Sequence, residues 1–266
     1  MSGSDKHQYL LRIQFLGFRY SGWQQQPKVK TVEGMLLKTL RFVLPGRKVK
    51  LLGAGRTDAM VSALDFGLQL ILSGPPLDSK KAFLLEMNHN LPADIRLTSV
   101  QNATTDFNAI RDCEHKTYRY YFTYGAKPHP FSAPFLGYFP GDLDIGAMMQ
   151  AASCFQGTHN FRGFIVQPSG STHIRREVVQ ARLELNTDFT ASFFPGDSYF
   201  LEVGGPGFGR YQVRVMMTAL LALGRGTLST RELEGSLETG ASLGLSEIVP
   251  ASGLQLVKVV FTEPGI

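Results

Sequence analysis

The order of predicted secondary-structure elements repeats along this chain of 266 residues. In each half, apolar residues alternate in four segments, as in half-buried strands, and recur with helical spacing in others. In the first half, the strands are predicted at 9–15, 48–52, 64–72 and 95–100, and the helices at 32–43 and 79–89. In the second half, the strands are predicted at 116–124, 176–185, 198–203 and 254–261, and the helices at 143–155, 210–223 and 230–238. Both halves therefore follow the order βαββαβ, the second with one additional helix.

This order restricts the fold to a known arrangement. βαββαβ is the ferredoxin-like order that many RNA-binding modules share. We therefore predict an α+β fold of two ferredoxin-like (RNA-recognition-motif-like) modules, with their sheets side by side and a central catalytic cleft. The basic N-terminal module spans 8–112 and the C-terminal module spans 113–266. A fold class does not by itself define a function.

Composition predicts a globular protein of the cytoplasm. With 43% hydrophobic and 18% charged residues, the chain can bury a core and differs from disordered proteins. Its apolar runs are far shorter than the roughly 20 residues of a membrane-spanning helix. The first residues lack the apolar segment of a secretory signal, and two cysteines are too few for a disulfide framework. We expect no membrane partner.

Positive charge is concentrated near the N-terminus. Residues 6–57 contain eleven Lys and Arg and a single acid, Glu33. Charge interleaved with aromatic rings is typical of surfaces that bind looped or single-stranded nucleic acid. A solvated basic surface is the alternative, and we expect two of the rings, Phe15 and Phe42, to belong to the core. The rings in question are Phe15, Phe18, Tyr20, Trp23 and Phe42.

Several familiar catalytic signatures lack their context. GASLG at 240–244 matches the G-x-S-x-G turn of hydrolases, but a polar helix precedes it and no Asp or His follows. GAGRTD at 53–58 has an aspartate where a dinucleotide-binding loop needs its third glycine. The histidines and cysteines show none of the usual metal-ligand spacings. We expect chemistry without a metal or a cofactor.

The segment LGAGRTDA at 52–59 is the best candidate for a catalytic loop. Gly53 and Gly55 permit a tight turn and a close ligand. Arg56 can contact a phosphate, and its charge favours the ionised form of Asp58. A carboxylate beside a phosphate-binding surface repels nucleic acid, which indicates that Asp58 takes part in chemistry. The alternative is that Asp58 caps a turn, as Asp often does in loops.

GAGRTDA at 53–59 resembles the signature loop of the tRNA pseudouridine synthase A family, whose essential aspartate matches Asp58. Other segments agree with the family in order and spacing, and the resemblance spans nearly the whole chain. They are YSGWQQQ at 20–26, NLPADI at 90–95, DFNA at 106–109, KTYRY at 116–120, GTHNF at 157–161, YQVR at 211–214 and PASGL at 250–254. Several blocks in the right order are far more specific than one motif.

The resemblance implies an isomerase that converts uridine to pseudouridine in tRNA, at positions 38–40 of the anticodon arm, and that commonly forms a homodimer. By matched position, Asp58 is the catalytic carboxylate. It would initiate glycosidic cleavage by attack on the sugar or base, or by removal of a sugar proton. Tyr118 would stack on the target base, and Arg214 would pair with Asp58. Arg56 would help to hold the flipped nucleotide.

These roles agree with the residues themselves. A base within a stem must leave the stack before it can react, so the enzyme needs a pocket, a ring and a charge. Tyr118 lies on an aromatic face of its predicted strand, and we expect the rest of that face to be core. Arg214 begins an apolar helix, where burial requires a partner such as a carboxylate. Exposure at the start of the helix is the alternative for Arg214.

The chain departs from the family pattern next to the candidate aspartate. The family usually has Gly-Val-His after the Asp-Ala pair, whereas this chain has Met60, Val61 and Ser62. Arg162, Gly163 and Ser252 also depart from the family pattern, at positions further along the chain from the candidate aspartate. The altered residues directly after Asp58 motivate an alternative of a different class, a catalytically silent RNA-binding protein on the same scaffold. A third hypothesis is an acid–base enzyme that acts on a small phosphorylated molecule.

Overall fold

The computed structural model describes residues 6–245 and 247–262 of the chain. Over these ranges it is a mixed α+β protein with mostly antiparallel strands and five α-helices. The chain divides into two compact units, one of residues 1–115 and 256–266 and the other of residues 116–255. Residues 246 and 263–266 of the predicted C-terminal module lie outside the described ranges.

The first unit contains an antiparallel sheet in the strand order β4-β1-β3. β2 also pairs with β3, and so does the last strand, β11, whose residues 256–261 belong to this unit. Tyr9 and Leu11 of β1 lie opposite Leu70 and Leu68 of β3, so their side chains enter the same core. The strands are β1 (Lys6–Phe15), β2 (Val49–Gly53), β3 (Ser62–Ser73), β4 (Ile95–Ala103) and β11 (Leu254–Phe261).

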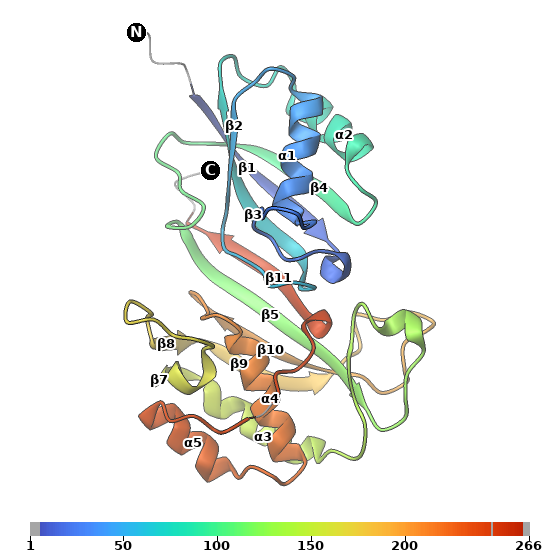
Figure 1. Ribbon diagram of the computed structural model, residues 1–266, viewed down its shortest axis with the longest axis vertical. Helices are drawn as coiled ribbons and strands as arrows, with labels where there is room; N and C mark the ends of the chain where they lie inside the picture. Colours follow the sequence, from blue (N-terminus) through green and yellow to red (C-terminus); the bar gives the residue numbers. More distant parts are fainter. Residues whose placement is uncertain (1–5, 246, 263–266) are drawn as a thin grey trace. The chain divides into compact units, whose positions relative to one another are not determined.

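Two helices, α1 (Val32–Val43) and α2 (Lys80–Asn90), lie on one face of this sheet (Figure 1). Each begins after a hydroxyl residue whose side chain accepts a hydrogen bond from the first turn, Thr31 from the amide of Gly34 and Ser79 from that of Ala82. The prediction of a helix at 32–43 is confirmed.

The aromatic residues of the basic stretch separate into core and surface, though not as predicted throughout. Phe15 is buried, as expected, and so are Tyr20 and Trp23, which therefore do not offer open rings to nucleic acid. The prediction for Phe42 is wrong, because this side chain is 70% exposed. The buried stripe of α1 follows Val32, Leu36, Leu40 and Val43, and Phe42 lies off that stripe.

The second unit is built on an antiparallel sheet in the order β5-β10-β9, and β6 adds to β5 as a parallel strand. β7 and β8 form a separate two-stranded sheet. The strands are β5 (Cys113–Tyr124), β6 (Gly137–Phe139), β7 (Gly157–Asn160), β8 (Arg175–Val178), β9 (Gln180–Leu185) and β10 (Tyr199–Gly205).

The helices of this unit are α3 (Ile145–Ala152), α4 (Gln212–Gly224) and α5 (Thr230–Thr239), which lie together in Figure 1. α4 is almost entirely buried, and a capping box of Ser229 and Glu232 begins α5. Within the described ranges, no helix is long and apolar enough to cross a membrane. Short 3₁₀ turns lie at Gly17–Arg19, Pro130–Ser132, Ser153–Phe155, Phe161–Phe164 and Ala251–Gly253.

Three predicted elements of the second half differ in their bounds. The strand predicted at 176–185 is two strands that pair with different partners, because the chain breaks at the exposed Val179. The helix predicted at 210–223 begins only at Gln212, since Tyr211 has a left-handed φ of 61°. The helix predicted at 143–155 ends at Ala152 and continues as a 3₁₀ turn.

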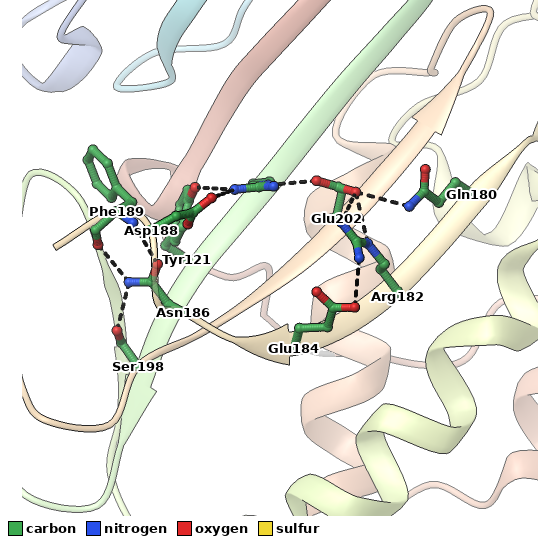
Figure 2. Close-up of polar contacts among 10 residues, drawn as sticks. Tyr121, Gln180, Arg182, Glu184, Asn186, Asp188, Phe189, Ser198 and Glu202 are labelled. Carbon is green, nitrogen blue, oxygen red and sulfur yellow. Dashed lines mark hydrogen bonds and ion pairs between the residues drawn. The ribbon is translucent and has the colours of Figure 1, made fainter.

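A buried carboxylate organises one face of the β5-β10-β9 sheet (Figure 2). Glu202 on β10 accepts from Arg119 Nε at 2.6 Å, from Arg182 Nε at 2.9 Å and from Gln180. Arg119 also donates to Asp188 at 2.7 Å. Glu202 and Arg119 face each other directly across the strands, so this pair fixes the register at the position next to Tyr118.

Replacement of Glu202 by alanine should destabilise the protein by roughly 2 to 4 kcal/mol, because two partly buried guanidinium groups lose their shared carboxylate. The matched control is Glu184→Ala on β9, whose carboxylate is largely exposed and, among residues 6–245 and 247–262, binds only Arg182, with an expected loss of at most about 0.5 kcal/mol. Urea unfolding of both variants measures the difference. Equal losses would show that Glu202 does not organise the sheet.

Candidate active site

Asp58 lies in the loop that joins β2 to β3 in the first unit. The two strands are antiparallel neighbours as far as Gly53 and Leu68, and the amide of Ala54 then donates to the carbonyl oxygen of Gly67 at 2.9 Å. Asp58 is half-buried, whereas Arg56 is exposed. Both ends of the loop are therefore fixed on paired strands.

The segment 17–23 holds this loop through the backbone. The amide of Trp23 donates to the carbonyl oxygen of Thr57 at 3.1 Å. The amide of Met60 donates to the carbonyl oxygen of Tyr20 at 3.0 Å. Asp58 thus lies between two loop residues that are both bound to the same neighbouring segment.

Two glycines allow the segment 17–23 to approach the loop so closely. Gly22 has a φ of 89°, and a Cβ atom there would lie 2.6 Å from the carbonyl oxygen of Thr57. A Cβ atom on Gly17 would collide with the carbonyl group of Val61. The amide of Gly17 donates to the hydroxyl of Ser62 at 2.9 Å, so Ser62 also secures the loop.

Met60 adopts a backbone conformation that favours glycine. Its φ is 67°, and the amide of Val61 donates to the carbonyl oxygen of Asp58 at 3.2 Å, which closes a turn over 58–61. Glycine is favoured at the third position of such a turn, where φ is positive. Methionine takes the same conformation here at a cost of about 1 kcal/mol. The departure from the family pattern therefore leaves the turn in place.

A three-residue polar cluster anchors the start of segment 17–23. The Tyr20 hydroxyl donates to Asp94 Oδ1 at 2.6 Å, and Arg19 Nη2 lies 2.7 Å from Asp94 Oδ2. Burial raises the pKa of the Tyr20 hydroxyl, and the hydrogen bond to Asp94 raises it further, so the hydroxyl remains a donor. Burial by itself would raise the pKa of Asp94, but the hydrogen bonds from Tyr20 and Arg19 hold it below its ordinary value.

Aromatic packing fixes the other end of the segment. The Trp23 and Phe66 rings stack with their centroids 4.2 Å apart. A Cβ atom on Gly53 would lie 2.9 Å from both rings, so only glycine fits at this last residue of β2. The amide of Trp23 that binds the loop is thereby held against the sheet.

In the second unit, Tyr118 lies on β5 opposite Val203 of β10. Its ring is half-buried and meets the edge of Phe208, with the centroids 5.4 Å apart. Tyr120 and Phe122, on the same face of β5, are fully buried, as expected for core residues. Tyr118 is thus less buried than the next two rings of its face.

Arg214 lies in the first turn of α4. Its Nε and Nη2 atoms donate to the carbonyl oxygen of Val249 at 2.9 and 2.7 Å, and its guanidinium group lies 4.8 Å from the centroid of the Tyr211 ring. A backbone carbonyl and a ring thus hold Arg214 within its unit. Its expected pairing with Asp58 stays a prediction.

The structure places the four candidate residues in two units, Asp58 and Arg56 in the first, Tyr118 and Arg214 in the second. Sequence reasoning did not single out the residues that hold the loop, namely Gly22 and Asp94. Both lie inside segments that resemble the family, YSGWQQQ and NLPADI, and that is the signal that could have found them. Over the described residues, no group of three His, Cys, Asp or Glu could hold a metal ion.

Comparison with known proteins defines the class. Residues 151–262 match the family described as tRNA pseudouridine synthase. The protein therefore carries the domain of an RNA-modifying isomerase.

Curated relatives define the family more narrowly. The chain is 31% identical over 260 residues to tRNA pseudouridine synthase A of Thermodesulfovibrio yellowstonii, covering 94% of this chain and 98% of the relative. The proteins of that name from Geotalea uraniireducens and Limosilactobacillus fermentum are 32% and 30% identical, over 96% and 97% of this chain and 99% and 98% of their own lengths. The chain belongs to the tRNA pseudouridine synthase A family, which confirms the resemblance inferred from the sequence.

Replacement of Tyr20 by phenylalanine should destabilise the protein by about 2 kcal/mol at neutral pH, because a buried charge-assisted hydrogen bond to Asp94 is lost. The hydrogen bonds from Tyr20 and Arg19 hold the pKa of Asp94 below its ordinary value, so its contribution is present at neutral pH and is lost as the pH falls through the folded-state pKa. The difference from wild type should therefore shrink at acid pH. Urea unfolding between pH 7 and about pH 3 measures it.

Tyr138→Phe is the matched control, since the Tyr138 hydroxyl donates to a neutral group, the carbonyl oxygen of Gly125. The stability lost in Tyr138→Phe should not depend on pH over this range. A Tyr20→Phe difference that stays constant down to the lowest pH would contradict the role given to Asp94.

The positive φ of Met60 leads to a prediction about substitutions at this position. Met60→Val should be less stable than Met60→Asn by about 1 to 2 kcal/mol, because a β-branched residue is strained at positive φ and asparagine tolerates it. Midpoints of urea unfolding compare the two variants. Equal midpoints would show that the turn at 58–61 does not need a left-handed residue.

Proposed function

We propose that this protein converts uridine to pseudouridine in the anticodon arm of tRNA, at positions 38–40, with Asp58 as the catalytic carboxylate. Membership of the tRNA pseudouridine synthase A family supports the reaction and the substrate class. The observation that carries the role of Asp58 is the loop around it, whose backbone is bound to segment 17–23 on both sides of this residue.

The reaction needs a fixed carboxylate and a base that has left the stack. The bond between C1′ of the ribose and N1 of uracil breaks, the base turns, and a bond from C1′ to C5 forms. The C5 hydrogen leaves as a proton and N1 takes up a proton, so the product is an isomer of uridine. Electrons balance without an oxidant or reductant. Flipping the nucleotide requires unpairing and unstacking, so the pocket must replace the lost contacts.

The second unit would supply those contacts. The half-buried ring of Tyr118, fixed by the Phe208 edge, is suited to stack on the flipped uracil. Arg214 is held at one side of its guanidinium by Val249 and would pair with Asp58. Arg56 is exposed within the loop and would hold the phosphate of the flipped nucleotide. The two units would bring these groups together around the target.

The finer fold description belongs to the same proposal. The first unit has the element order β1-α1-β2-β3-α2-β4, with β1 and β3 paired at the centre, which supports a ferredoxin-like module. The second unit would be the other module, with β6, β7 and β8 as additions. We propose a first module at 8–112 and a second at 113–266, in which residues 256–261 of the second module complete the sheet of the first unit. We also propose a central cleft and a homodimer in the cytoplasm.

The silent RNA-binding alternative rested on the residues after Asp58. Met60 takes the conformation that a glycine would take, and the hydroxyl of Ser62 binds the amide of Gly17. Both residues therefore maintain the loop, which supports the active enzyme over the silent binder.

The test uses tRNA transcripts with tritium at C5 of uridine. Wild-type protein should release tritium, and Asp58→Ala should lower the rate by at least about 1000-fold, as expected when the group that initiates the chemistry is removed. Asp78→Ala, an exposed acid of the same unit, should keep the wild-type rate. A nearest-neighbour map of the product identifies the uridine.

Two outcomes would contradict the proposal. If wild type and Asp58→Ala bind tRNA equally and neither releases tritium, the silent binding protein is the correct reading. If both release tritium at the same rate, another group performs the chemistry.

A further inference from the structure

A surface of α1 combines exposed charge with an exposed ring. Phe42 is 70% exposed although it lies within the last turn of a regular helix. Lys38 lies one turn earlier on the same side, and Arg41 is adjacent in sequence. Both cationic side chains are exposed. Lys38, Arg41 and Phe42 are called the α1 patch below.

We propose that the α1 patch is a second RNA contact, which binds a part of the tRNA away from the target uridine. A base stacks on Phe42, and phosphates pair with Lys38 and Arg41. The proposal rests on the proposed function in taking tRNA as the ligand, but it concerns a surface that the isomerisation itself does not use.

The charge of the patch is not neutralised within the protein. Among residues 6–245 and 247–262, no ion pair involves Lys38 or Arg41. The single acid of α1, Glu33, lies at the other end of the helix, where it accepts from the amide of Gln25 at 2.7 Å. Cations near the end of a helix also interact favourably with its dipole. The helix dipole therefore accounts for the two cations at this end of α1, but it does not account for the exposed ring of Phe42.

The ring needs a partner that tolerates the two charges. Exposed apolar surface is unfavourable by about 25 cal/mol per Å², so most of the hydrophobic gain available to Phe42 is not realised in the free protein. A second copy of the same patch would bring four cations together and is opposed by their repulsion. RNA offers bases for the ring and phosphates for the cations at once. Looped RNA is therefore the partner whose chemistry matches all three side chains.

The patch is held at a fixed distance from the Asp58 loop. The first turn of α1 is bound to segment 17–23, through the amide of Val32 to the Gly22 carbonyl oxygen at 3.2 Å and the amide of Glu33 to the Trp23 carbonyl oxygen at 3.0 Å. A helix rises 1.5 Å per residue, so Phe42 lies about 15 Å further along the axis than Val32. One rigid helix thus connects the loop to the patch. An RNA of more than a few nucleotides can contact both.

The test measures the affinity of the full-length protein for an unmodified tRNA transcript by fluorescence anisotropy. Phe42→Ala should weaken binding by about tenfold or more, the effect of one lost stack between a base and a ring. Lys38→Ala combined with Arg41→Ala should lower the slope of log K against log salt by about 2. The control is Leu85→Ala on α2, an apolar side chain 59% exposed, which should bind as wild type does. Circular dichroism verifies that each variant is folded.

Unchanged tRNA affinity in both patch variants would overturn the proposal. So would a Phe42→Ala variant that keeps its tRNA affinity but loses self-association in sedimentation velocity, or loses binding to phosphatidylserine vesicles. Tritium release by the wild type, measured in parallel, tests the proposed function separately. If the patch variants bind tRNA more weakly but the wild type releases no tritium, the α1 patch is supported as an RNA contact and the proposed isomerase activity is contradicted.

Discussion

The two backbone hydrogen bonds on either side of Asp58 are the constraint on which the rest of the first unit depends. They join Trp23 to Thr57 and Met60 to Tyr20 through main-chain atoms alone. A main-chain bond does not require a particular side chain, so the loop can keep its shape while its residues change. This is how methionine at position 60 and serine at position 62 coexist with the same turn. What cannot change freely is the space between the segments, which the glycines at positions 17 and 22 leave open.

Periodicity predicted the elements of the first unit well, because each of them has one face in the core. α1 and its cap Thr31 follow directly from apolar spacing and a hydroxyl residue. Phe42 was assigned to the core because it is apolar, whereas helix geometry places it away from the buried stripe. The start of α4 was missed because the left-handed backbone of Tyr211 has no signature in its side chain. The apolar pattern therefore predicts which face of a helix or strand is buried better than it predicts the residues where that element begins and ends.

The candidate site shows the same division between what residue types indicate and what geometry decides. Asp58 and Arg56 are recognisable from chemistry and from the family's signature loop. The role of Asp94 depends on contacts with Tyr20 and Arg19, 74 and 75 residues earlier in the chain, which no local pattern records. Burial of Arg214 required an acceptor, and the sequence favoured a carboxylate. Within its unit the acceptor is the backbone carbonyl of Val249, which any residue type could provide.

The first unit is not continuous in sequence, and this affects how the protein is made. Its sheet includes β11, which neighbours β3 and of which residues 256–261 belong to this unit, while the other strands of that sheet and both helices of the unit come from residues 6–115. β1 occupies one edge of β3, and β2 covers the other only at 68–72, so the rest of that edge depends on β11. On the ribosome, the unit that carries Asp58 therefore waits for residues 256–261 to be synthesised before its sheet is complete. Until then the open edge of β3 can pair with another chain, so the nascent protein is exposed to aggregation until β11 has been made.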